Sequence, residues 1–384
     1  MEEVDSFILN KKKIDEKHNR KTSKGYSTKH RKTVKFAKPL VLTLAEIKDA
    51  PYTPMKCNPL FDGKTIASNS CYTANVLRDL KKAFNHTHKS DPIKTDDPKT
   101  IWKELRVRLK CTKEDCWLQA IKDEKTRRQI KEYIFAPYHP KEWNHNPNEW
   151  LSNIDIFNVL SQYEDRYSNF EFIGPSFIDF ARPSEDDVCV STELCKFSLG
   201  ELMKRKKDKI AIVFNLDKHT GPGTHWVSLF VDVKDKFIFY FDSAGTKIPQ
   251  EIMKLVKTIQ KQGLLSSKPI RFKFFQNAPF EHQFSNTECG MYSLFFIITL
   301  LTEEIDVPNS SGDRRSPTEL SLRNVGCVNA PSEPPKVVQG CVRSTLTRPN
   351  HYKFKSCKDK IFFFKKVRIT DKYVEKLRSE YFNS

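Results

Sequence analysis

A histidine and an aspartate are placed where a β-hairpin would bring their side chains together. His225 lies at the start of an alternating run that predicts a strand over 224–233. A second predicted strand, over 236–241, runs directly into Asp242. With a two-residue turn between the strands, Asp242 faces Val227 and has His225 as its diagonal neighbour on the same face. Such an aspartate accepts the imidazole N–H and stabilises the imidazolium. The alternative is an edge-strand histidine beside a turn aspartate.

A cysteine occurs later, in the sequence Gln-Phe-Ser-Asn-Thr-Glu-Cys-Gly at 283–290, where an apolar run predicts a buried helix. The helix dipole and the unpaired N–H groups at the helix start favour a thiolate at Cys289. With His225 nearby, it would form the thiolate–imidazolium pair that attacks a carbonyl. We expect Gln283 to donate its amide to the oxyanion, and Gly290 to allow close approach of the substrate. The alternative is that the cysteine is a small buried hydrophobe.

Taken together, these residues have a characteristic order along the chain: His225, Asp242, Gln283 and Cys289. They stand in the motifs His-Trp, Asp-Ser and Gln-x5-Cys-Gly, with 17 residues from His225 to Asp242 and six from Gln283 to Cys289. This pattern resembles the SUMO-specific and adenovirus-type cysteine proteases. The resemblance covers about 143–301, with a closing helix near 370–382. It implies these four catalytic residues and a papain-like-superfamily core, with the nucleophile at the N-terminus of a buried helix. Papain itself differs, because its cysteine precedes its histidine.

Shorter motifs resemble the core-protein proteases of large nucleocytoplasmic DNA viruses, including poxviruses. They are Gln-Tyr-Glu at 162–164, Phe-Ile-Gly-Pro at 172–175 and Glu-Cys-Gly-Met at 288–291. This resemblance implies cleavage of structural precursors after Gly-Gly or Ala-Gly pairs during virion maturation. The expected location is therefore the virion and the viral assembly sites of the host cytoplasm. The resemblance also implies that Trp150 and Trp226 form the walls of a narrow tunnel for small substrate residues. Core packing is the alternative role for Trp150.

The patterns around these motifs predict an α+β fold with a central mixed sheet flanked by helices. Strands are expected at 170–173, 210–214, 224–233, 236–241 and 270–275. Helices are expected at 152–163, 249–260, 291–301 and 370–381. The first helix opens with Ser152-x-x-Asp155, a capping-box pattern, and Ile154, Phe157 and Leu160 should share one side. Val374 and Leu377 should lie together on the last helix.

Three regions are expected along the chain. Residues 1–50 form a basic, largely disordered tail, because they hold too few large apolar residues for a core. Residues 51–140 form a small helical accessory domain, indicated by apolar residues at helical spacing in 74–84 and 101–109. Residues 141–384 form the protease domain. Within it, 306–350 lacks periodicity and is expected to be a disordered insertion.

Charge and cysteine usage indicate what the chain binds. The net charge of +18 favours contact with polyanions. Residues 11–38 hold twelve Lys or Arg against two acidic residues, which indicates non-specific DNA binding; a solvated tail is the alternative. The ten scattered cysteines are interpreted as reduced thiols. Cys111 and Cys116 lack partners at zinc-ligand spacing, so neither a metal nor a cofactor is expected. No apolar run is long enough for a membrane span, and no secretion signal is expected.

The sequence therefore predicts a thiol endopeptidase whose partners are protein substrates, the structural precursors of a virus. A protease that removes ubiquitin or a SUMO-like modifier is the first alternative, because it would use the same four residues. The second alternative belongs to another class: a catalytically inactive virion protein that binds DNA or the viral core. The complete set of catalytic residue types argues against this second alternative.

Overall fold

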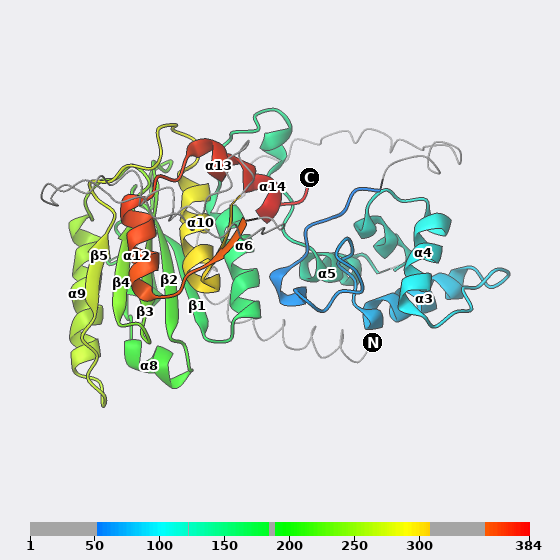
Figure 1. Cartoon of the computed structure of the whole chain (residues 1–384), viewed down its shortest axis with the longest axis horizontal. Coiled ribbons are helices and arrows are strands. Elements are labelled where there is room, and N and C mark those ends of the chain that lie inside the picture. Colours follow the sequence, from blue (N-terminus) through cyan, green and yellow to red (C-terminus); the bar gives the residue numbers. More distant parts are fainter. Residues whose placement is uncertain (1–51, 122, 184–188, 308–349) are drawn as a thin grey trace, which may run out of the picture. The chain divides into compact units, whose positions relative to one another are not determined.

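The computed structural model describes residues 52–121, 123–183, 189–307 and 350–384. The predicted basic tail and most of the predicted insertion at 306–350 lie outside these residues. The chain divides into two compact units. Unit 1 is Met1–Pro137 with Asn383, and unit 2 is Tyr138–Phe382 with Ser384. Figure 1 labels the helices and strands of both units.

Unit 1 is helical, as its apolar spacing predicts. It contains α3 (Ala74–Thr87), α4 (Pro98–Leu109) and α5 (Glu124–Ile134), with 3-10 helices η1 (Pro59–Phe61) and η2 (Glu114–Ala120). The side chains of Thr73, Asp97 and Asp123 accept backbone N–H groups at the starts of the three α-helices. These caps satisfy donors that have no partner within a helix. The helices share a core that includes Leu77, Leu80, Phe84, Ile101, Leu105 and Trp117.

Six cysteines correct the expectation of reduced thiols. They form the disulfides Cys57–Cys71, Cys111–Cys116 and Cys189–Cys195, with Cα–Cα separations of 5.1, 6.0 and 6.2 Å. A disulfide spans such separations. The folded loops bring these thiols together, and no regular spacing in the sequence reveals the pairing. Among the cysteines that the structure describes, Cys289 and Cys357 are unpaired.

The centre of unit 2 is a five-stranded mixed sheet in the order β1-β2-β3-β4-β5. Its strands are β1 (Phe170–Phe177), β2 (Lys209–Asn215), β3 (Trp226–Asp232), β4 (Phe237–Phe241) and β5 (Lys273–Gln276). β1 is parallel to β2 and β4 is parallel to β5, whereas β3 is antiparallel to both of its neighbours. Every predicted strand is present, although β5 begins three residues later than expected. The predicted α+β class is confirmed.

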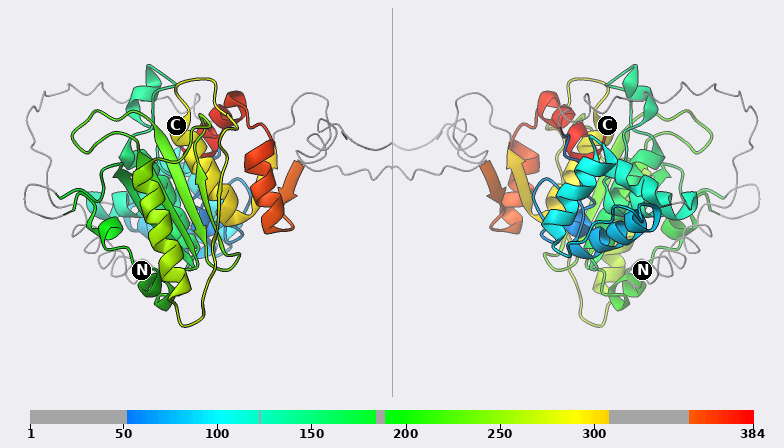
Figure 2. Two further views of the ribbon diagram at one scale, coloured as in Figure 1. Left: turned by 90° about the vertical axis from the view of Figure 1, so that its left-hand side faces the viewer. Right: turned by 90° about the vertical axis from the view of Figure 1, so that its right-hand side faces the viewer.

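Helices cover both faces of this sheet, and Figure 2 shows α9 and α10 on opposite sides of the strands. One face packs against α8 (Leu199–Lys204) and α9 (Gln250–Leu264). The other packs against α6 (Asn153–Arg166), α10 (Cys289–Thr302) and α12 (Cys357–Lys366). Alternate β3 residues divide between the two cores: Phe230 joins the α10 side, and Leu229 and Val231 join the α9 side. Because both faces are covered, the central strands are almost wholly buried.

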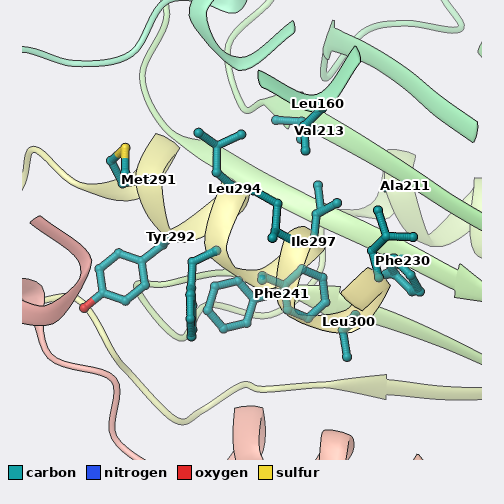
Figure 3. Close-up of a cluster of buried hydrophobic side chains, with 14 of the residues drawn as sticks. Leu160, Ala211, Val213, Phe230, Phe241, Met291, Tyr292, Leu294, Ile297 and Leu300 are labelled. Atoms are coloured by element: carbon teal, nitrogen blue, oxygen red, sulfur yellow. The ribbon is translucent and has the colours of Figure 1, made fainter. Parts of the chain in front are cut away.

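The helix α10 is enclosed on all sides, as its continuous apolar sequence predicts. Every residue from Cys289 to Leu301 is buried. Figure 3 shows its aliphatic side chains packed among those of the sheet and of α6. Burial of each such side chain contributes roughly 1.5–3 kcal/mol. A residue at the start of α10 is therefore held by a rigid core.

The start of α6 has the predicted capping box. The Ser152 hydroxyl accepts the N–H of Asp155, and the carboxylate of Asp155 accepts the N–H of Ser152 at 2.8 Å. The predicted apolar face is partly wrong, because Ile154 is 64% exposed. The helix is rotated relative to the prediction and turns Ile156, Val159 and Leu160 toward the core. Tertiary packing against the sheet and α10 selects this face.

The C-terminal part of unit 2 contains several short elements. β6 (Glu304–Val307) and β7 (Asn350–Lys353) form an antiparallel pair at the two ends of the predicted insertion. The helix predicted at 370–381 is two short helices, α13 (Asp371–Lys376) and α14 (Arg378–Tyr381), which meet at Leu377. Val374 and Leu377 are buried, as expected. The remaining helices are η3 (Lys141–Asn144) and α7 (Thr192–Cys195).

Candidate active site

His225 and Asp242 meet at one end of the β3–β4 hairpin. The ladder pairs Ser228 with Phe241 and continues to Asp232 opposite Phe237, which is the predicted register. The His225 Nε2 atom lies 2.7 Å from Asp242 Oδ1. The aspartate is fully buried, whereas the side chain of His225 is 22% exposed. The hairpin thus places an acid behind an imidazole that remains accessible.

Several donors hold the Asp242 carboxylate in place. Its Oδ1 also accepts the Ala244 N–H at 2.9 Å, and its Oδ2 accepts the Thr246 hydroxyl. The Asn277 side chain binds the backbone of Asp242 twice. Its amide oxygen accepts a hydrogen bond from the Asp242 N–H at 3.0 Å, and its amide nitrogen donates to the Asp242 carbonyl at 2.6 Å. These hydrogen bonds fix the position of the carboxylate and of the backbone that carries it. Thr246 and Asn277 were not predicted, because a polar residue in a loop carries no local signal of which side chain it will contact.

The imidazole of His225 connects the acid to the cysteine. Since Nε2 faces Asp242, Nδ1 is the nitrogen that serves its hydrogen bond to Cys289. Burial disfavours protonation, but the hydrogen bonds and charges of Asp242 and Cys289 outweigh it and raise the pKa of His225 to about 10. The histidine is therefore protonated near neutral pH, and its imidazolium contacts the Cys289 side chain.

Cys289 is the first residue of α10 and is only 2% exposed. The side chain of the preceding Glu288 makes no cap hydrogen bond to the helix; its carboxylate pairs with Arg378 at 2.9 and 3.1 Å instead. The N–H groups of the first turn are therefore not used by that side chain. The N–H of Cys289 is thus a candidate donor to an oxyanion.

Gln283 is held from the end of the same hairpin. Its amide oxygen accepts the Ser243 hydroxyl at 2.6 Å, and its backbone N–H donates to the Ser243 carbonyl at 2.9 Å. The oxygen is therefore occupied, so the Nε2 group is what the side chain presents as a donor. Ser243 follows Asp242 directly, so one short segment carries the acid and also holds the candidate oxyanion donor in place.

The two tryptophans occupy different environments. Trp226 is 7% exposed, and its indole N–H donates to the Leu151 carbonyl at 2.9 Å. Trp150, the residue before Leu151, is 40% exposed. Trp226 is therefore a core residue, and its hydrogen bond holds the segment that contains the exposed Trp150. A Cβ at Gly290 would lie 3.0–3.4 Å from the Leu151 side chain, so this glycine leaves room for Leu151.

Two other histidines could compete for the role of base. His219 pairs with Asp179 at 2.8 Å, at the exposed end of another loop. His282 is fully buried, between the Phe364 carbonyl at 2.9 Å and the Ile369 N–H at 3.3 Å. Burial lowers the pKa of His282 to about 4. His282 is therefore neutral and has a structural role.

Across residues 52–121, 123–183, 189–307 and 350–384, no group of three His, Cys, Asp or Glu residues could hold a metal ion. In the same residues, no helix has the length and apolar content needed to cross a membrane.

Comparison with known proteins finds one protease family and several viral proteins that are similar to this chain. The Ulp1 protease family, C-terminal catalytic domain, matches residues 191–311. A protein of Acanthamoeba polyphaga mimivirus named as a thiol protease is 29% identical over 290 residues, covering 69% of this chain and 91% of the relative. A cysteine protease of African swine fever virus is 33% identical over 155 residues, covering 38% of this chain and 56% of the relative. The chain therefore spans about half the length of that second relative.

A crystal structure of the same African swine fever virus protease supports the fold. It matches with a TM-score of 0.51 at 19% sequence identity, covering 88% of this chain and 98% of the other. The matched family region contains His225, Asp242, Gln283 and Cys289. The chain therefore carries a catalytic domain of the Ulp1 protease family and is a cysteine-type peptidase homologous to the thiol proteases of mimivirus and African swine fever virus.

Proposed function

We propose that this peptidase is an endopeptidase that cleaves viral structural precursors after Gly-Gly or Ala-Gly pairs during virion maturation. It would act in the virion and at assembly sites in the host cytoplasm. The observation that carries the chemistry is the chain of contacts from Asp242 through His225 to Cys289. The relatives in two large DNA viruses support the viral setting.

The proposed mechanism uses four groups. The Cys289 thiolate attacks the scissile carbonyl carbon, and the new oxyanion accepts hydrogen bonds from Gln283 Nε2 and the Cys289 N–H. The His225 imidazolium then gives its proton to the leaving amine, which departs and leaves a thioester. His225, now neutral, takes a proton from water as the water oxygen attacks the thioester carbon. The C–S bond then breaks, which releases the acid product and restores the Cys289 thiolate beside the imidazolium. Asp242 keeps the imidazole oriented and stabilises its positive charge.

The preference for small residues is supported by the surroundings of the nucleophile. Trp150 is exposed, and Leu151 joins it to Gly290 and Trp226. The aromatic ring of Trp150 therefore lies on a segment that packs directly against the residue after Cys289. In the proposed role, the Trp150 ring would form a flat wall beside the scissile bond, which would admit glycine or alanine and exclude larger side chains.

Removal of a ubiquitin-like modifier is the second candidate function. It is favoured by a relative in African swine fever virus that is named a SUMO-1 cysteine protease. The proposed catalytic groups would serve either substrate equally. A catalytically inactive virion protein is not supported, because the chain is a cysteine-type peptidase by family.

One experiment separates the two candidates. Purified protein is offered Gly-Gly-X and Ala-Gly-X peptides, matched peptides with valine at the two small positions, and SUMO and ubiquitin thiol-trapping probes. Cys289→Ala serves as the control for every substrate. Cleavage of only the small-residue peptides, without capture of either probe, supports the maturation protease. Capture of a probe with little peptide cleavage supports the modifier protease.

Non-specific DNA binding through residues 11–38 stays a prediction. These residues lie outside the part of the chain that the structure describes. Twelve cations in this segment would release phosphate counterions, so binding to any duplex should weaken steeply with salt. Titration of the full chain and of a form lacking residues 1–38, at two salt concentrations, tests this directly.

A further inference from the structure

The backbone between the candidate oxyanion donor and the nucleophile is held by a carboxylate from the C-terminal segment. Asp371, the first residue of α13, accepts the Phe284 N–H at 3.0 Å and the Ser285 N–H at 3.0 Å through Oδ2. Phe284 directly follows Gln283 in the chain. One carboxylate oxygen therefore fixes the two peptide groups that come next after the Gln283 side chain.

The same carboxylate also reaches the nucleophile helix. The hydroxyl of Tyr292, three residues after Cys289 on α10, lies within hydrogen-bond distance of both Asp371 Oδ1 and the Ile369 carbonyl, at 3.0 Å from each. Figure 3 shows this hydroxyl pointing away from the aliphatic cluster toward the C-terminal ribbon. Burial, with the charge of Asp371 nearby, raises the pKa of Tyr292, so it remains a neutral donor. Asp371 thus joins α13, the loop after Gln283 and the first turn of α10.

Besides Asp371, this loop is contacted by the Arg368 guanidinium, which lies over the Phe284 ring at 3.3 Å from its centroid. Residues 284–286 are exposed, and the Phe284 ring is 63% exposed. The residues on either side of the loop are buried. Gln283 is hydrogen-bonded to Ser243, and Glu288 forms an ion pair with Arg378. The peptide groups at Phe284 and Ser285 therefore depend on Asp371 for their orientation. A carboxylate that accepts several N–H groups makes strong hydrogen bonds.

We propose that Asp371, assisted by Tyr292, is a positioning residue for the oxyanion donor Gln283. This proposal rests on the proposed function, specifically on Gln283 as a donor to the tetrahedral intermediate. The carboxylate does not touch the substrate. It fixes the loop at Phe284 and Ser285, so that the Gln283 amide group keeps the orientation set by Ser243. Small misplacements of such donors are costly, because an oxyanion hole acts through preorganisation.

The first test compares three variants by peptide hydrolysis. Asp371→Asn keeps the size of the side chain but loses its charge, so the amide oxygen holds the Phe284 and Ser285 N–H groups more weakly than the carboxylate does. Tyr292→Phe removes only the hydroxyl. Glu375→Gln, at an exposed carboxylate of the same helix, is the matched control. Asp371→Asn should lower kcat about tenfold to a hundredfold with little change in KM, Tyr292→Phe should lower it less, and Glu375→Gln should leave it unchanged.

A second measurement separates positioning from general damage. Alkylation of Cys289 by iodoacetamide requires the thiolate but no oxyanion stabilisation, so its rate in Asp371→Asn should stay near that of the parent protein. Equal losses in alkylation and hydrolysis would overturn the proposal, because the damage would then extend to the nucleophile. If Asp371→Asn fails to fold by thermal melting, the same comparison is made with Tyr292→Phe.

A double-mutant cycle decides whether Asp371 acts through Gln283. Asp371→Asn added to Gln283→Ala should cause little further loss, because the group being positioned is already absent. Two losses that multiply would overturn the inference while leaving the peptidase function intact. An unchanged kcat in Gln283→Ala would overturn the oxyanion role and the inference together. A parent protein that hydrolyses none of the peptides would instead count against the proposed function.

Discussion

The environment of Asp242 predicts an unusually mild effect of Asp242→Asn. The new amide can lie in two orientations, but the Ala244 N–H requires an oxygen at the Oδ1 position. The Thr246 hydroxyl at the other position can accept from an amide as well as donate to a carboxylate. The amide oxygen should therefore remain toward His225, and the imidazole should keep its tautomer.

The loss is then limited to the negative charge. A hydrogen bond to a charged group is worth about 1.5–3 kcal/mol against about 1 for a neutral one, and the imidazolium also loses a Coulomb partner. We expect a total of about 2–3 kcal/mol, which corresponds to about 30- to 150-fold in kcat/KM. The pKa of His225, now about 10, should fall in the variant. Since activity needs the imidazolium, the alkaline limb of the pH profile should move to lower pH.

The assay is peptide hydrolysis across pH 5–11 for the parent protein and Asp242→Asn. A double variant, Asp242→Asn with Thr246→Val, is measured beside them, because the second change removes the hydroxyl that accepts a hydrogen bond from the new amide. That double variant should lose more activity than Asp242→Asn alone. A loss near 10⁴-fold, with an unshifted alkaline limb, would refute the reasoning and indicate a flipped amide and the wrong tautomer.

Three other predictions follow from the same site. Cys289→Ala should abolish hydrolysis while the melting temperature stays close to that of the parent, because one small buried residue replaces another; residual turnover would exclude it as nucleophile. His225→Ala should be as inactive, whereas His219→Ala should keep most activity because its partner is Asp179 in another loop; the reverse result would mean that the base is misassigned. Gly290→Ala should cost about 1–3 kcal/mol of unfolding free energy by crowding Leu151, measured in urea, and Leu151→Ala should reduce that penalty.

The strands and the buried helix were predictable because their signals are local. The alternation around 224–241, together with a short turn, fixes the hairpin register that brings His225 to Asp242. The unbroken apolar run after Cys289 predicts a helix enclosed on all sides. The capping box at Ser152 is equally local, since both of its hydrogen bonds lie within four residues.

Contacts between distant segments could not be predicted in this way. The rotated face of α6 depends on its packing against the sheet and α10, which lie far from it in sequence. Arg378 illustrates the reason, because its partner Glu288 is 90 residues away and nothing in either local sequence specifies the other. The hydrogen bond from the Trp226 indole to the Leu151 carbonyl is another such contact, since these residues are 75 positions apart.

The sequence by itself determined the catalytic residue types, their order and the two local elements that carry them. Hydrogen-bonded strands have a period of two and buried helices lack a polar face, so a local pattern specifies these elements directly. Only the tertiary structure decided which groups hold that chemistry in place: Thr246 and Asn277 around Asp242, Ser243 on Gln283, and Asp371 on the loop before Cys289. These contacts join loops from different parts of the chain, and their partners are fixed only when the core brings the loops together.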